Sequence, residues 1–101
     1  MAPMQIFQQY LSIVSAESGI SEDRILSKSR EADVVDARSI LFHILHIYSL
    51  YPAQIAREAG MSERQVNNII NSFQDRLRQS RFLQDVLRDV KGRCPELRND
   101  K

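Results

Sequence analysis

The chain has 101 residues, a length that allows one domain with a single core and excludes several domains. Its composition is 43% apolar and 27% charged with three Gly and three Pro, which is ordinary for a globular protein and unfavourable for a many-turned β fold. The net charge of +1 excludes a strongly basic nucleic-acid binder, unless the basic residues gather locally.

Residues 3–18 predict a first helix, because apolar side chains recur there every three or four positions and Gly19 supplies a left-handed residue to end it. Ser21 is expected to cap a short second helix that closes near Leu26. Residues 27–32 are polar and have no apolar period, which predicts a loop.

The third predicted helix is capped by Asp33 or Asp36, runs to about Tyr48 and is apolar over most of its circumference. A helix with so little polar surface belongs at the centre of a bundle. Residues 49–51 are expected to form a connection, and Pro52 is placed to open the next helix, where its missing N–H costs nothing.

Apolar periodicity predicts two more helices in the C-terminal part of the chain. One runs to about Gln79, and Ser80 is expected to cap the other, which Gly92 and then Pro95 stop. The apolar stripe of this last helix is expected in the core, and an exposed stripe would instead form a homodimer surface. The stripe consists of Phe82, Leu83, Val86, Leu87 and Val90.

The predicted fold is all-α, a compact bundle of five to six helices, with one domain over residues 1–92 and a flexible tail over residues 93–101. Cys94 is expected in that polar tail and has no second Cys for a disulfide, which favours a reducing compartment. No apolar run approaches the roughly 18 residues that span a bilayer, and the first ten residues lack the features of a signal peptide. These features predict a cytoplasmic protein without a membrane partner.

Residues 52–71 carry a spacing that helix-turn-helix DNA-binding proteins share. The spacing consists of Ala56, Gly60, Val66 and Ile69. Gly60 takes the positive φ that the turn needs, and Ser62 with Gln65 forms a capping box at the start of the second helix. The helix-turn-helix is therefore predicted over about residues 52–79.

The second helix of this motif is expected to show polar side chains to solvent, because its apolar residues turn inward. Asn can pair bidentately with adenine in a major groove, and Arg with guanine or a phosphate. The predicted DNA-contacting residues of this segment are Ser62, Glu63, Arg64, Asn67, Asn68 and Asn71. Local charge favours this interpretation weakly, since residues 57–81 carry five basic and three acidic side chains, against four basic and six acidic in residues 1–38. A polar solvated face is the open alternative.

Several stretches of the chain match one family. They are residues 25–30 (ILSKSR), residues 34–38, Ser49-Leu50 with Pro52 and Ile55, and residues 60–66. On these stretches the chain, over about residues 7–90, resembles the C-terminal DNA-binding domain of the bacterial replication initiator DnaA, whose fold the Trp repressor shares. The resemblance implies that Lys28 and Arg30 contact the minor groove and backbone, and that Arg38 contacts a phosphate at a helix start. Without the resemblance, Lys28 and Arg30 would be ordinary solvated charges.

The chain also departs from that family. The family's signature turn reads Gly-Gly-Arg-Asp-His-Thr-Thr-Val, whereas residues 60–66 read Gly-Met-Ser-Glu-Arg-Gln-Val, and two residues are inserted near Tyr51. Recognition of the initiator's usual DNA box is therefore not expected. The Gly-rich phosphate loop of the initiator's ATPase does not occur, so the chain is either a stand-alone relative or a fragment of a longer protein.

Other signals indicate no further chemistry. His43 and His46 lie three residues apart, but no third ligand joins them, so no metal is expected. No catalytic set of side chains occurs, and we expect no enzyme, no cofactor and no small-molecule substrate. Two functions stay open: a sequence-specific binder of double-stranded DNA in bacterial replication or transcription, or a helical protein-interaction module that kept the fold without DNA binding.

Overall fold

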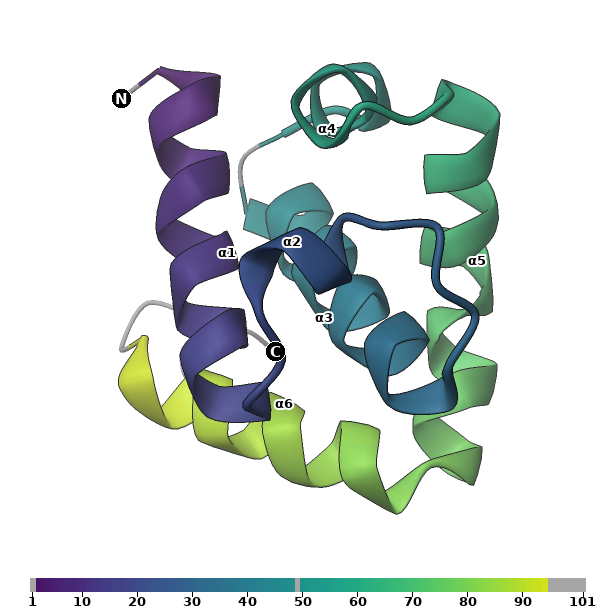
Figure 1. The fold of residues 1–101 in the computed structure, drawn as a ribbon. Helices are drawn as coiled ribbons and strands as arrows, with labels where there is room; N and C mark the ends of the chain where they lie inside the picture. The colour runs from purple at the N-terminus through teal and green to yellow at the C-terminus, as the bar shows by residue number, and fades with distance from the viewer. Residues whose placement is uncertain (1, 49, 95–101) are drawn as a thin grey trace.

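Six α-helices make up the computed structural model, which describes residues 2–48 and 50–94. They are α1 (Pro3–Ser18), α2 (Glu22–Ile25), α3 (Ala32–Tyr48), α4 (Pro52–Ala59), α5 (Glu63–Gln79) and α6 (Arg81–Arg93). No strand occurs in these residues, which confirms the predicted all-α class. Figure 1 shows α1 and α5 on opposite sides of the molecule, with α4 above and α6 below.

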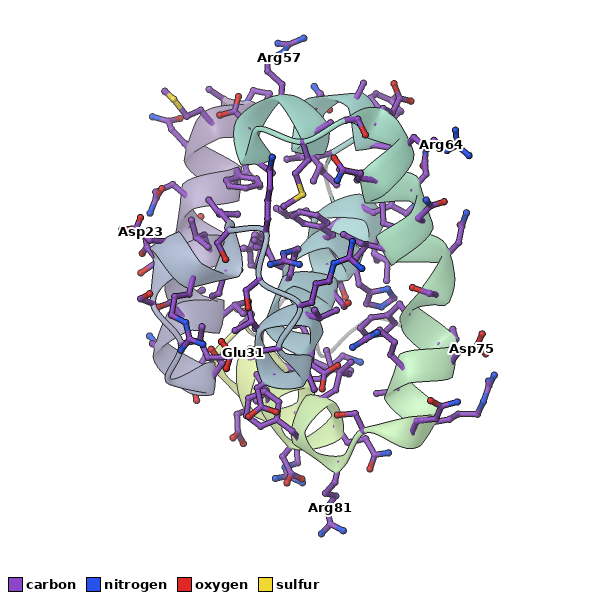
Figure 2. The ribbon with its side chains drawn as sticks, turned by 45° about the vertical axis from the view of Figure 1, so that its right-hand side comes forward. Asp23, Glu31, Arg57, Arg64, Asp75 and Arg81 are labelled. Atoms are coloured by element: carbon purple, nitrogen blue, oxygen red, sulfur yellow. The ribbon has the colours of Figure 1, made fainter. Side chains whose placement is uncertain are left out.

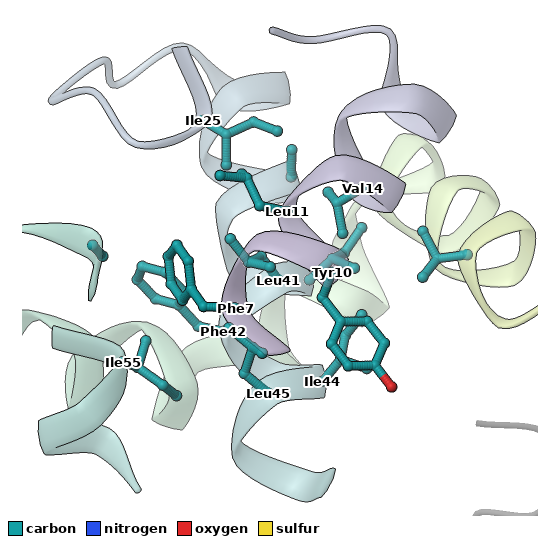
Figure 3. Packing of buried hydrophobic residues seen from close by; sticks show 14 of the residues in the cluster. Phe7, Tyr10, Leu11, Val14, Ile25, Leu41, Phe42, Ile44, Leu45 and Ile55 are labelled. Carbon is teal, nitrogen blue, oxygen red and sulfur yellow. The ribbon is translucent and has the colours of Figure 1, made fainter. Parts of the chain in front are cut away.

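Helix α3 lies at the centre of the bundle, as its apolar circumference predicted. It packs against all five other helices, and Figure 1 shows it running between α1 and α5. Figure 3 shows Phe7 and Leu11 of α1 in one cluster with Leu41 and Phe42 of α3. Each such buried side chain stabilises the fold by about 1.5–3 kcal/mol.

Serine caps and left-handed glycines set the helix ends that the sequence predicted. Gly19 and Gly60 follow α1 and α4 with φ of 76° and 69°. The Oγ atoms of Ser21, Ser62 and Ser80 each accept a hydrogen bond from the amide three residues on, at 3.3, 3.1 and 3.0 Å. These caps satisfy amides that the first turn of a helix leaves without a partner.

The start of α3 corrects the prediction that an aspartate caps this helix. The helix begins at Ala32, so Asp33 lies in its first turn and Asp36 lies inside it. Asp36 is buried, and its carboxylate binds side chains of other elements instead of capping the helix. It accepts hydrogen bonds from Nε of Arg76 at 3.2 Å and from Oγ of Ser80 at 2.6 Å.

The C-terminal helix extends farther than predicted. It continues through Gly92 to Arg93, whose guanidinium pairs with the carboxylate of Glu17 in α1 at 2.8 Å. Cys94 is 2% exposed and therefore belongs to the core, not to a polar tail. The predicted boundary at residue 92 is thus too early by two residues, and the predictions for residues 95–101 fall outside the described residues.

The apolar stripe of α6 faces the core as predicted, with Phe82 partly buried. Its buried members are Leu83, Val86, Leu87 and Val90. None of the helices in the described part of the chain combines the length and apolar character needed to cross a membrane. Of the predicted connection between α3 and α4, Ser49 falls outside the described residues.

Candidate functional site

Helices α4 and α5 are joined by a three-residue turn at which the chain changes direction steeply. Figure 1 shows α4 nearly end-on, whereas α5 runs down the page. The amide of Met61 donates to the carbonyl of Ala56 at 3.0 Å, and Gly60 supplies the left-handed conformation. Ala56 and Ala59 are buried, and their small side chains allow α5 to pack closely against α4. Two helices and a tight turn therefore occupy the predicted positions.

The loop between α2 and α3 is fixed by hydrogen bonds of its own serines. We call residues 27–31 the basic loop. Oγ of Ser27 donates to the carbonyl of Arg24 at 2.6 Å and accepts from the amide of Ser29 at 3.1 Å. Oγ of Ser29 accepts from the amide of Glu31 at 3.2 Å. Such side-chain bonds replace the backbone partners that a loop lacks, so these serines have a structural reason for their positions.

The cations of the basic loop face solvent. Lys28 and Arg30 are exposed and form no ion pair with any residue that the structure describes. Glu31, the acid next to them, pairs with Arg24 across the base of the loop. The charge of Glu31 is therefore compensated locally, and the charges of the two cations are available to an external anion.

Arg38 lies beneath the basic loop, which corrects the prediction that it contacts a phosphate at the surface. The residue is only 7% exposed. Its Nε donates to the carbonyl of Ile25 at 2.8 Å, and its Nη2 donates to the carbonyls of Ser27 and Ser29 at 2.6 and 3.2 Å. Burial disfavours the charged form and lowers the pKa of the guanidinium from its usual value. Arg38 is thus a buried support of the loop.

A groove of about 310 Å³ lies between the basic loop, the α4–α5 turn and the first half of α5. It brings the predicted Lys28 and Arg30 beside the start of α5, and Gly60 and Met61 of the turn also line it. None of the described residues that line this groove is acidic. Its charged and amide side chains are Lys28, Arg30, Arg38 and Gln65.

The polar residues of α5 divide into stripes, because positions three or four apart share one side of a helix. Gln65 and Ile69 line the groove, and Gln65 is a groove residue that sequence reasoning used only as a cap. The adjoining outward stripe contains three of the predicted contacts, all exposed. They are Arg64, Asn68 and Asn71.

The remaining predicted residues of α5 are less well placed. Glu63 and Asn67 do not line the groove. Asn67 is three residues from Arg64 and four from Asn71, but unlike them it is half-buried. The hydroxyl of Ser62 serves as the helix cap. Of the predicted contacts on this segment, Arg64, Asn68 and Asn71 therefore remain as exposed side chains of the outward stripe, and none of the three lines the groove itself.

Ion pairs divide the exposed arginines into two groups. Those outside the candidate surface, including Arg78, Arg81, Arg88 and Arg93, pair with acidic side chains within the chain. Among the described residues, the exposed arginines without an ion pair are Arg30, Arg57 and Arg64. Figure 2 shows Arg57 and Arg64 projecting outward from α4 and α5, far from Arg81. Arg57 had not been predicted as part of the site, and only its lack of an acidic partner distinguishes it.

The histidines of α3 show no metal geometry. The ring of His43 stacks on Phe73 of α5, with centroids 3.8 Å apart and an interplanar angle of 7°. His46 is exposed. No group of three or more metal-binding side chains gathers anywhere in residues 2–48 or 50–94.

Comparisons of the chain with family models, with curated proteins and with solved structures find no match. The geometry of the groove and the distribution of charge around it therefore carry the functional interpretation.

Proposed function

We propose that the chain binds double-stranded DNA, with the outward stripe of α5 in a major groove and the basic loop on the adjoining backbone or minor groove. The groove between these two elements carries the proposal, because three cations and no acidic side chain line it within the described residues. Such a surface attracts phosphates although the net charge of the chain is only +1, since the local potential steers association.

Each part of the surface has a separate role in this proposal. Lys28 and Arg30 suit phosphate oxygens, contacts that position a protein on the duplex without reading sequence. Asn68 suits the edge of an adenine through two hydrogen bonds, and Arg64 suits a guanine or a phosphate. A steep crossing of α4 on α5 agrees with helix-turn-helix docking, in which the first helix crosses the backbone while the second enters the groove.

The resemblance to the DNA-binding domain of DnaA supports the same function and favours bacterial replication initiation or its regulation. Residues 27–30 of its first matching stretch line one groove with Gly60 and Met61 of the α4–α5 turn, which favours a joint contact to one duplex. The different residues at positions 60–66 favour a target other than the usual box of the initiator.

A helical protein-interaction module is the second candidate, and the near-neutral charge favours it. A large exposed apolar patch would favour such a module. The large hydrophobic side chains that are exposed in the described residues are Met4, Ile47 and Tyr51. A few exposed apolar side chains are ordinary on a monomeric surface, so the acid-free groove favours DNA binding over this alternative.

Selection from a library of random-sequence duplexes at modest salt tests the proposal. We expect the native chain to retain duplexes and to enrich one motif. Replacement of Asn68 by Ala should weaken binding to that motif about tenfold and relax one position, since a bidentate base contact contributes about 1–3 kcal/mol.

Asn67→Ala is the matched control, because it removes the same amide from a neighbouring position that is half-buried, whereas Asn68 is exposed. It should change affinity less than about twofold, as expected for a residue that reads no base. Failure to retain any duplex contradicts the proposed function. Equal losses in the two variants contradict the assignment of the outward stripe.

A further inference from the structure

We infer that Arg38 is a positioning residue, which holds the basic loop in the shape in which Lys28 and Arg30 meet one DNA backbone together. The inference rests on the proposed DNA-binding function. It assigns Arg38 a part in binding that does not require contact with DNA, because its side chain is buried beneath the loop.

The hydrogen bonds of Arg38 fall on the peptide groups that orient the two cations. The carbonyl of Ser27 belongs to the peptide group that leads into Lys28, and its oxygen is 2.6 Å from Nη2 of Arg38. The carbonyl of Ser29 leads into Arg30 and lies 3.2 Å from the same nitrogen. One guanidinium therefore fixes both peptide groups at once.

The third bond of Arg38 joins the loop to the body of the molecule. Nε donates to the carbonyl of Ile25, the last residue of α2, at 2.8 Å. Ile25 is itself fully buried, so the guanidinium connects a rigid part of the core with the exposed loop. A planar guanidinium with donors in a fixed fork can span these three oxygens, whereas the single ammonium of a lysine cannot reproduce the arrangement.

The arrangement also preserves positive charge at the site. Arg38 bonds to neutral carbonyls and forms no ion pair with any residue that the structure describes. Its charge therefore adds to that of the groove that it lines. A loop that is ordered before binding also avoids the entropy cost of ordering it on the duplex.

The experiment combines loop dynamics with a mutant cycle on the full chain. Arg38→Met keeps the apolar stem and removes the donors, and Arg38→Lys keeps the charge without the fork. Ser39→Ala is the control, because Ser39 is the neighbouring buried residue and bonds to Val35 of its own helix at 2.8 Å. Amide exchange of residues 27–31 is measured without DNA. Affinity for a random-sequence duplex is measured at low salt in the native and the Lys28→Ala/Arg30→Ala backgrounds.

We expect Arg38→Met to speed exchange of the Ser29 and Glu31 amides about tenfold more than Ser39→Ala does, with Arg38→Lys in between. Arg38→Met should weaken duplex binding about tenfold in the native background and less than about twofold when Lys28 and Arg30 are already absent, because coupled residues are not additive. If Arg38→Met does not fold, as judged by circular dichroism, Arg38→Lys carries the same comparison.

Loop exchange that is equal in Arg38→Met and Ser39→Ala overturns the inference. An affinity loss as large without Lys28 and Arg30 as with them also overturns it, because Arg38 would then act on DNA directly. A native chain that binds no duplex contradicts the proposed function. Faster loop exchange in Arg38→Met than in Ser39→Ala would in that case still show that Arg38 holds the loop.

Discussion

Asp36, Arg38 and Ser39 are polar residues buried in α3, and each satisfies its side chain in a different way. Asp36 binds Arg76 and Ser80 from the end of α5, Arg38 binds loop carbonyls, and Ser39 binds its own helix. Within the described residues, no buried side-chain nitrogen or oxygen lacks a hydrogen-bond partner. If a partner is removed, the desolvation cost of the buried group is no longer offset and the fold loses stability.

Replacement of Asp36 by Asn tests the importance of the link between α3 and the α5–α6 junction. The side chain of Asp36 is 5% exposed and that of Arg76 is 34% exposed, so the pair is only partly shielded from water. The variant removes the negative charge that faces Arg76 and replaces the oxygen that accepts from Ser80 with an NH2 donor. We expect a loss of about 1–3 kcal/mol in the free energy of unfolding. Urea unfolding measures it without adding salt that screens the pair.

Asp85→Asn is the control for this prediction. Asp85 pairs with Arg81 and Arg88 on α6, but its side chain is 41% exposed. Exposed pairs contribute about 0–1 kcal/mol, so this variant should be nearly as stable as the native chain. Equal destabilisation by the two variants would show that the burial of Asp36 does not increase its contribution to stability.

At the level of elements, the α4–α5 turn depends on the conformation of a single glycine. Gly60 has φ of 69°, and a Cβ added there meets no heavy atom within 4 Å. In a Gly60→Ala variant the left-handed backbone conformation is therefore the source of strain, and we expect a loss of about 1–2 kcal/mol in the free energy of unfolding. Thermal or urea unfolding measures the change.

Gly92→Ala is the matched variant, because Gly92 lies within α6 and its added Cβ also meets nothing within 4 Å. Alanine is the better helix former, so we expect this variant to gain up to about 1 kcal/mol. The two substitutions should thus change stability in opposite directions. Destabilisation of similar size by both would contradict the role assigned to the turn.

Helix boundaries were predictable where the signal lies within a few residues of the boundary. Ser62 and Gln65, for example, satisfy each other three positions apart. The predicted cap of α3 was wrong. Asp36 is a good capping residue by type, but its side chain bonds to partners 40 and 44 residues away in the chain. No local pattern contains such a partner, and the same holds for the burial of Arg38.

The candidate site was predictable only in part for a related reason. Lys28 and Arg30 were expected from a family resemblance, since no periodicity distinguishes them from solvated charges. The distinction between Asn67 and Asn68 depends on burial, because Asn67 is half-buried and Asn68 is exposed, and burial follows only from packing. Whether an arginine is free or paired, as for Arg57 against Arg81, likewise depends on its neighbours in space.

For the whole molecule, the arrangement of charge matters more than its sum. The net charge of +1 is the sum over two regions that differ in how their basic side chains are paired. The exposed arginines of α6 are paired with acids of the same chain. The cations that line the groove form no ion pair with any of the described residues. A near-neutral chain can therefore present one surface suited to phosphates.

The salt dependence of duplex binding tests this account most directly, in three chains: native, Lys28→Ala/Arg30→Ala, and Arg81→Ala/Arg88→Ala. Both double variants lose two positive charges, but Arg81 and Arg88 lie on α6 and pair with Asp85. The account predicts that loss of Lys28 and Arg30 flattens the plot of log affinity against log salt by about 1.8, since each phosphate contact contributes about 0.9. The α6 variant should keep the native slope. Parallel slopes in all three chains, or no duplex binding by the native chain at low salt, would contradict it.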